Sequence, residues 1–122
     1  MKFITGILAL SLAVFGFSNA QAVGGFLPIK YDSNNQQLVD TLDYGLQEAI
    51  YDQIGEGQLS EGEWELAEVL SVKQQIVAGV NYDFVVDIED ENGDNARLDF
   101  IVYDELNGKK SLVESEVLQM GN

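Results

Sequence analysis

The side chains that most often carry out covalent chemistry are missing from this chain. Its 122 residues include no cysteine and no histidine. A nucleophilic triad of the Ser/His or Cys/His type therefore cannot be assembled, and a zinc ion would find only carboxylate ligands. The 21 acidic residues could still form a general acid–base pair, but such a pair needs a cleft that binds substrate. We therefore predict a protein that is not an enzyme and that has no cofactor and no metal site.

One acidic segment superficially looks like a calcium loop. It reads Asp90-Glu91-Asn92-Gly93-Asp94-Asn95. In an EF-hand loop the glycine stands at the sixth position and a glutamate closes the loop at the twelfth. Here the glycine comes two positions too early and no glutamate closes the loop, so the segment is predicted to be a turn between two strands.

The first 20 residues read as a secretory signal peptide. Lys2 supplies a positive start, and the segment from Phe3 to Phe17 is apolar apart from two hydroxyl residues. Ser18-Asn19-Ala20 offers a cleavage site before Gln21, and a second possible cut lies after Ala22. Because the apolar run is too short for a comfortable membrane span, an anchor that stays attached is the less favoured alternative. We predict a protein that is secreted or found in the lumen of the secretory and endolysosomal pathway, with residues 21–122 forming a single domain.

The charge of the chain excludes two classes of partner. Its formal net charge is −15, and cleavage of the signal peptide would make it −16, because one lysine and no acidic residue would be lost. A protein this acidic is repelled by phosphate backbones and by anionic lipid head groups. We therefore expect no binding to nucleic acid, and none to membranes after signal cleavage.

One long helix is predicted over residues 33–54. Ser33 is a candidate N-cap, with Gln36 three residues later as in a capping box. Gly45 in the middle of the helix is unfavourable by about 1 kcal/mol relative to alanine, which suggests that the helix backbone packs closely on a sheet. Glycines at 55 and 57 are expected to end the helix. Apolar residues recur at helical spacing and predict one buried stripe: Leu38, Val39, Leu42, Leu46, Ala49, Ile50 and Ile54.

Four strands are predicted after the helix, and a short extended segment before it. The four cover residues 64–76, 80–89, 97–104 and 112–118. The first changes the parity of its apolar residues, which predicts a bulge, while the second alternates regularly from Val80 to Glu89. Asn107-Gly108 is a strong hairpin signal between the last two strands. The fold class is therefore α+β, with an antiparallel sheet of four to five strands wrapped around one long helix.

The turn between the first two long strands has an unusual composition. It lies in the stretch Gln75-Ile76-Val77-Ala78-Gly79, which is apolar and uncharged around its glycine. Exposed hairpin tips usually carry Asn, Asp, Gly or Ser. An apolar tip therefore indicates either a contact surface or a strand register different from the predicted one.

These elements together resemble the cystatins, which inhibit papain-like cysteine proteases. Gln75-x-Val77-x-Gly79 matches their Q-x-V-x-G signature, and a glycine trunk, a helix, this hairpin and a second hairpin follow in the family's order over essentially the whole mature chain. The resemblance implies a reversible, tight-binding inhibitor that blocks the active-site cleft of a cathepsin-type protease. The residues expected to contact the protease are Val23, Gly24 and Gly25 in the trunk, Gln75, Ile76, Val77, Ala78 and Gly79 in the first hairpin, and Leu106 and Asn107 in the second.

Two features depart from the family pattern. The second hairpin of cystatins commonly carries Pro-Trp, whereas this chain has Leu106-Asn107 in a loop that looks slightly shorter. The cysteines of extracellular animal cystatins are absent, so the chain is chemically closer to stefins and plant cystatins. An alternative function is therefore a secreted cystatin-fold protein that binds a partner without inhibiting a protease. We expect a monomer, with a domain-swapped dimer hinged at residues 77–79 as the alternative.

Overall fold

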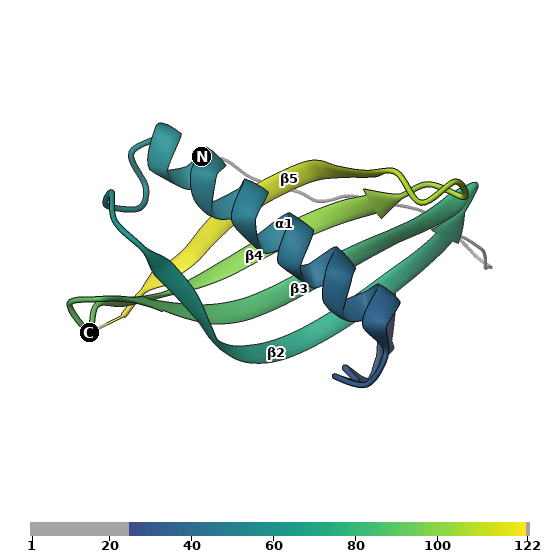
Figure 1. Ribbon diagram of the computed structural model, residues 1–122, viewed down its shortest axis with the longest axis horizontal. Helices are drawn as coiled ribbons and strands as arrows, with labels where there is room; N and C mark the ends of the chain where they lie inside the picture. The colour runs from purple at the N-terminus through teal and green to yellow at the C-terminus, as the bar shows by residue number, and fades with distance from the viewer. Residues whose placement is uncertain (1–24, 122) are drawn as a thin grey trace.

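The computed structural model describes residues 25–121, which fold as one helix packed on one antiparallel sheet (Figure 1). The five strands stand in the sheet in the same order as in the chain. The α+β fold predicted from the sequence is confirmed. No helix in this part of the chain has the length and the apolar run needed to span a membrane. The elements are β1 (Leu27–Ile29), α1 (Gln36–Gly55), β2 (Trp64–Val77), β3 (Gly79–Asp90), β4 (Asn95–Asp104) and β5 (Lys110–Met120).

The core lies between α1 and the concave face of the sheet. The period-2 residues of β3 and β4 point at the helix, and the rings of Phe84 and Phe100 stand with their centroids 5.3 Å apart. Most of the predicted stripe of α1 is buried against them, with Ile50 and Ile54 packed at its border. Val39 is the exception, because it is half-buried and lies outside this core. The largest fully buried side chains are Phe84, Phe100, Leu42, Ile88, Leu98, Gln53, Val72, Val86, Val102 and Thr41.

Gly45 brings the helix unusually close to the sheet. A Cβ atom placed on this glycine would lie 2.3 Å from Cγ2 of Val102 and 2.7 Å from the ring of Phe100. No real side chain fits at such distances. The prediction that this glycine permits close packing is confirmed, and the contact explains why a helix interior keeps a residue of poor helix propensity.

The start of α1 differs from the prediction. The N-cap is Asn35, whose side chain accepts a hydrogen bond from the backbone N–H of Leu38 at 3.2 Å, so the assignment of Ser33 as N-cap is wrong. The reason is a turn that precedes the helix, in which Asp32 accepts hydrogen bonds from the backbone N–H groups of Asn34 and Asn35. The side chain of Gln36 bonds to Asp40 along the helix and does not form a capping box.

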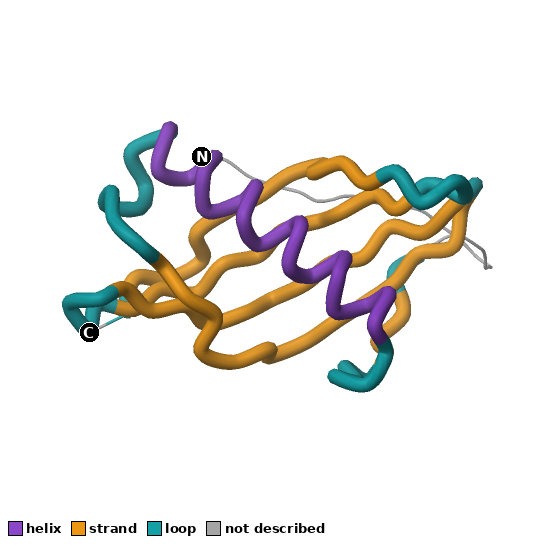
Figure 2. The backbone as a smooth tube through the Cα atoms, viewed as in Figure 1, coloured by secondary structure: helices purple, strands orange, loops and turns teal. Residues whose placement is uncertain are grey.

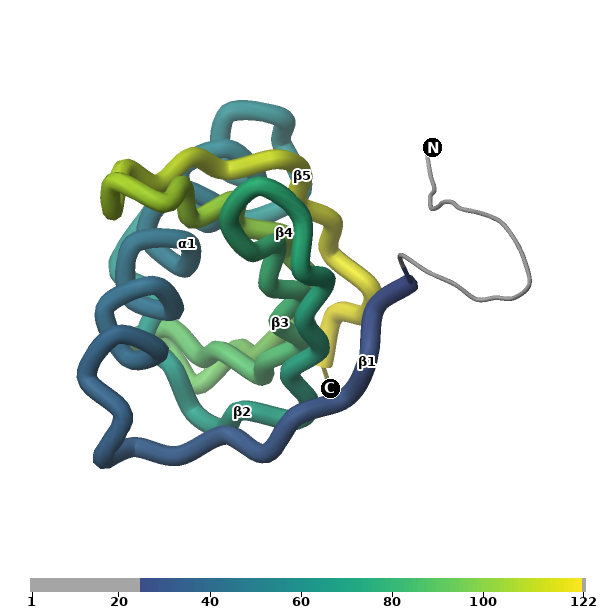
Figure 3. Tube along the Cα trace, turned by 90° about the vertical axis from the view of Figure 1, so that its right-hand side faces the viewer, coloured from purple at the N-terminus to yellow at the C-terminus, as the bar shows by residue number. Residues whose placement is uncertain are grey.

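The long strand β2 carries the irregularity that its sequence predicts. Its register against β3 shifts twice, between Leu66 and Glu68 and between Val69 and Ser71. Each shift bends the strand and increases its twist. The sheet therefore curls around the helix, as the end-on view shows (Figure 3).

Candidate functional site

Both long hairpins turn at the same end of the sheet. The β2–β3 turn is centred on Ala78, and the β4–β5 loop spans residues 105–109. The two lie next to each other because the first residues of β3 pair with the last residues of β4, Val80 with Asp104. In Figure 2 these turns lie at the right-hand end of the sheet, and the loop after α1 and the β3–β4 turn lie at the other.

The start of the described chain arrives at the same end. In β1, Leu27 pairs with Gln74 and Ile29 pairs with Val72 of β2. Continuing this antiparallel register sets Phe26 level with Gln75, and Gly25 just beyond it. Figure 3 looks onto this end and shows β1 beside β2. The predicted signal peptide and two of the predicted contact residues, Val23 and Gly24, lie outside the described residues.

Large apolar side chains project from this end into solvent. The exposed fractions are 68% for Leu27, 66% for Ile76, 45% for Val77 and 86% for Leu106. They account for four of the ten large hydrophobic residues that are exposed in the described chain, and they come from three separate segments. Exposed apolar side chains gathered in this way are a common feature of contact surfaces. We call residues 25–27, 76–78 and 106 the apolar edge.

The β2–β3 turn is tighter than the sequence predicts. Val77 pairs directly with Gly79, so Ala78 alone forms the tip, where a longer bend was expected. Gly79 has φ +114°, and a Cβ atom on it would lie 2.6 Å from the backbone oxygen of Asp104. The position therefore requires glycine for two reasons, its backbone conformation and the closeness of β4.

Gln75 lies at the base of this turn, and it is half-buried. Its side-chain oxygen accepts a hydrogen bond from the side-chain amide of Asn81 on β3, with 3.0 Å between the two atoms. Asn81 pairs with Tyr103 on β4, so the three residues form a row on the face opposite the helix. Gln75 thus has a local bracing contact within the hairpin, whereas the tip presents Ile76, Val77 and Ala78.

The β4–β5 loop holds its shape through its own backbone and one side chain. The backbone N–H of Glu105 donates to the carbonyl of Lys109 at 2.8 Å, and that of Gly108 donates to Glu105 at 2.9 Å. Asn107 accepts a hydrogen bond from the N–H of Lys109 at 2.9 Å. The hairpin predicted from Asn107-Gly108 is confirmed. Leu106 is the large apolar side chain that this loop exposes to solvent, while the side chain of Asn107 is engaged within the loop.

Tyr103 and Leu27 contribute to this end of the molecule although the sequence did not single them out. The hydroxyl of Tyr103 donates a hydrogen bond to the backbone carbonyl of Ala78. Leu27 extends the exposed apolar surface next to β2. Leu27 could have been found as an apolar residue two positions after the trunk glycines. The contact of Tyr103 has no sequence signal, because it depends on how β4 lies beside the turn.

A pair of carboxyl groups lies on the outer face of the sheet. Asp83 on β3 and Asp99 on β4 interact through a side-chain hydrogen bond. Burial, and after it the neighbouring Asp83, raise the pKa of Asp99 to about 9. Burial also raises the pKa of Asp83, against a smaller lowering by Asp99 and Lys73. At neutral pH the raised pKa of Asp99 favours its protonated form, because two adjacent, largely buried negative charges repel each other.

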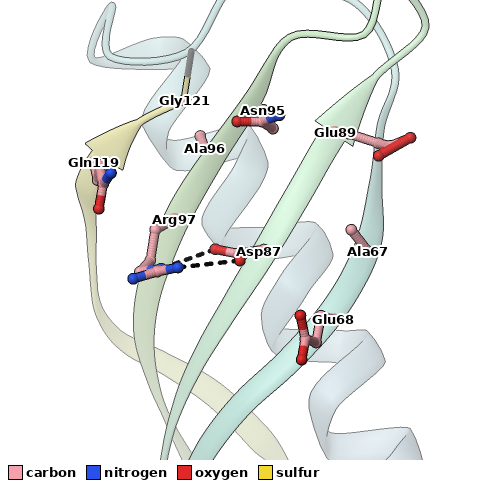
Figure 4. A pocket seen from close by; sticks show the side chains of 9 residues that line it. All are labelled: Ala67, Glu68, Asp87, Glu89, Asn95, Ala96, Arg97, Gln119 and Gly121. Atoms are coloured by element: carbon pink, nitrogen blue, oxygen red, sulfur yellow. Dashed lines mark hydrogen bonds and ion pairs between the residues drawn. The ribbon is translucent and has the colours of Figure 1, made fainter.

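The carboxyl pair does not line the depression that the structure shows at the opposite end of the sheet. That depression encloses about 270 Å³ near the β3–β4 turn (Figure 4). An ion pair between Arg97 and Asp87, 2.9 Å between nitrogen and oxygen, crosses it. Within residues 25–121 no group of three or more Asp and Glu side chains is arranged to hold a metal ion. Asp83 and Asp99 are half-buried, and neither lines this depression.

The comparisons with known proteins agree with this arrangement. The family model of the cystatin domain matches residues 24–114, which run from the trunk glycines through both hairpins into β5. A comparison with curated protein sequences found no match. Cystatins are inhibitors of cysteine proteases and are not enzymes. Because the match covers about three quarters of the sequence and includes every element of the apolar edge described above, this chain belongs to the cystatin family.

Proposed function

We propose that this protein is a reversible, tight-binding inhibitor of papain-like cysteine proteases and that the apolar edge enters the active-site cleft. The observation that carries the proposal is the gathering of exposed Leu27, Ile76, Val77 and Leu106 at one end of a sheet whose strands fix their spacing. The trunk residues Val23, Gly24 and Gly25 would add to this wedge from the β1 side. Inhibition would follow from occlusion of the cleft and would involve no covalent step.

The energetics of this wedge favour tight binding. Full burial of one aliphatic side chain of this size contributes about 1.5–3 kcal/mol. The strands below the β2–β3 tip and the β4–β5 loop are held by backbone hydrogen bonds in the free protein, so little conformational entropy is lost when the hairpins bind. The trunk before β1 has to be ordered on binding, and its contribution per residue is expected to be smaller.

A titration tests the proposal directly. Residual papain activity is measured with increasing amounts of the purified secreted protein, and we expect stoichiometric loss of activity that is regained on dilution. Trypsin serves as the control protease and should keep full activity, because its cleft differs from that of papain. Full papain activity at tenfold molar excess of the protein, in the micromolar range, would refute the proposal.

A second candidate function is a cystatin-fold binding protein that does not inhibit proteases. The observation that favours it is the second hairpin, where Leu106-Asn107 stands in place of the family's Pro-Trp and Asn107 is engaged within its own loop. Loss of a central aromatic contact commonly weakens an interface by 2 kcal/mol or more. The same papain titration distinguishes the two candidates, since this alternative predicts no inhibition.

We also propose that the protein is secreted, or delivered to the lumen of the secretory and endolysosomal pathway, after cleavage following Ala20 or Ala22. Intact mass of the secreted protein identifies the cut. Forms that start at Gln21, Val23 and Gly25 then test the trunk. We expect the Gly25 form to dissociate from papain fastest, because it lacks the Val23 side chain. Equal dissociation rates for all three forms would show that the trunk does not contact the protease.

A further inference from the structure

We infer that Tyr103 is a positioning residue that holds the tip of the β2–β3 hairpin in the conformation that binds the protease. This inference rests on the proposed function and deepens it. Tyr103 belongs to β4, yet its hydroxyl donates to the backbone carbonyl of Ala78, the single residue at the tip. Its side chain thus reaches across β3 to the turn between β2 and β3.

The tip needs such a contact because the strand ladder leaves it unsupported. The last backbone pair of the hairpin joins Val77 to Gly79, and Ala78 stands beyond it. Ala78 is exposed, and so are the neighbouring side chains of Ile76 and Val77. An apolar tip of this kind has no side chain of its own that could bond to the backbone, unlike turns built on Asn or Asp. The Tyr103 hydroxyl supplies that bond from outside the hairpin.

The ring of Tyr103 also limits where the turn can move. A Cβ atom on Gly79 would lie 3.0 Å from Cε1 and 3.2 Å from the hydroxyl oxygen of Tyr103, so the backbone of Gly79 lies against this side chain. The base of the hairpin is braced separately by the hydrogen bond between Asn81 and Gln75. The tip is therefore held from one side by Tyr103, while the ladder and the Gln75–Asn81 contact hold the strands below it.

Two apolar contact segments become linked by this arrangement. Tyr103 stands three residues before Leu106 on the strand that leads into the second hairpin. Fixing Ala78 against Tyr103 therefore fixes Val77 relative to Leu106. A wedge whose segments keep their spacing loses less entropy on binding than one whose tip samples several conformations, and the difference should emerge in the dissociation rate.

The test compares Y103F with Y51F. Y103F removes the hydroxyl and keeps the ring, whereas Tyr51 is an 80% exposed residue of α1 and serves as the matched control. We expect Y103F to dissociate from papain roughly three- to tenfold faster, as for the loss of one hydrogen bond, with the fold retained and the thermal midpoint lowered by a few degrees, because the same bond is lost from the free protein. Y51F should behave like the wild type. An unchanged dissociation rate for Y103F, with wild-type protein that does inhibit papain, would overturn the inference.

A double-mutant cycle with V77A separates positioning from direct contact with the protease. If Tyr103 acts by placing Val77, the effect of Y103F should largely disappear in the V77A background. Additive effects of the two substitutions would mean that Tyr103 acts independently of the tip, and they would overturn the inference.

A measurement on the free protein keeps this inference separate from the proposed function. The ¹⁵N order parameters of Ala78 and Gly79 should fall in Y103F from about 0.85 towards 0.6, while those of β3 stay unchanged. Should the wild type fail to inhibit papain, the proposed function fails, yet these order parameters still report whether Tyr103 holds the tip. Identical order parameters in wild type and Y103F would refute the positioning role.

Discussion

Replacement of Gly79 by alanine tests why the β2–β3 turn ends in glycine. The substitution has two separate costs. An L-residue held at φ +114° is strained by about 1–3 kcal/mol. The added methyl group would lie 2.6 Å from the backbone oxygen of Asp104, and relieving such an overlap costs a further 1–3 kcal/mol or so. We therefore expect G79A to lower the free energy of unfolding by about 2–6 kcal/mol.

Gly93 provides the control, because it has only the first of these costs. It stands in the β3–β4 turn with φ +87°, and a Cβ atom on it would meet nothing within 4 Å. We expect G93A to lower the free energy of unfolding by about 1–3 kcal/mol. The difference between the two variants then measures the contact between β4 and the turn, and urea unfolding followed by circular dichroism at fixed pH gives both values.

The two variants should differ in binding as well. In G79A the turn has to move away from Asp104, which displaces Val77 and Ala78 from the apolar edge, so we expect papain inhibition to weaken tenfold or more. G93A lies at the opposite end of the sheet and should inhibit as the wild type does. Equal losses of stability in G79A and G93A would refute the reasoning, because the Asp104 contact would then contribute nothing.

Three further variants test other parts of the structure. G45A should be less stable than the wild type by about 1–2 kcal/mol in urea unfolding, because the overlap with Val102 exceeds the gain of about 1 kcal/mol in helix propensity. G55A is the control and should stay within about 0.5 kcal/mol of the wild type, because the space at its Cβ position is open. Equal stability of the two variants would contradict the packing argument. Asp99 has a folded-state pKa of about 9, above its unfolded value, so its stabilising contribution is complete below about pH 4 and is lost as the pH rises towards 9. D99N should therefore flatten the fall in the free energy of unfolding between pH 5 and pH 8. An unchanged dependence of that free energy on pH would refute the buried-pair assignment. L106W should tighten papain inhibition about fivefold or more, and unchanged affinity in a folded protein would mean that the β4–β5 loop does not touch the protease.

The sequence predicted those parts of the fold that depend on periodicity and on turn chemistry. The leucine stripe predicted the buried face of α1, and the alternation from Val80 to Glu89 predicted β3, because burial on one side imposes these periods directly. The same logic found the Asn107-Gly108 hairpin. This reasoning failed at Ser33, because Asn35 is a second possible N-cap. The turn at Asp32 places Asn35 rather than Ser33 at the start of α1.

The parts that the sequence missed depend on contacts between residues distant in the chain. The interacting pair of Asp83 and Asp99 occupies the polar positions of two strands in which apolar and polar residues alternate. Side chains at such positions are usually expected to be solvated. Only the register of β3 against β4 brings the two together. Tyr103 was missed for the same reason, since its bond to Ala78 spans 25 residues. Of the predicted contact residues, Ile76, Val77, Ala78 and Leu106 are exposed at the apolar edge, while Gln75, Gly79 and Asn107 shape the loops that carry it.

In the β4–β5 loop, the residues that maintain the backbone conformation differ from the residue that forms the exposed apolar surface, so the two can evolve separately. Gly108, at φ +89°, and the side chain of Asn107 stabilise the backbone of the loop, while the side chain of Leu106 is 86% exposed. A substitution at Leu106 therefore alters the surface that meets a partner and leaves the hairpin intact. Selection can act on partner preference at this single position without passing through unstable intermediates, so the loop is free to diversify while the sheet behind it stays constant.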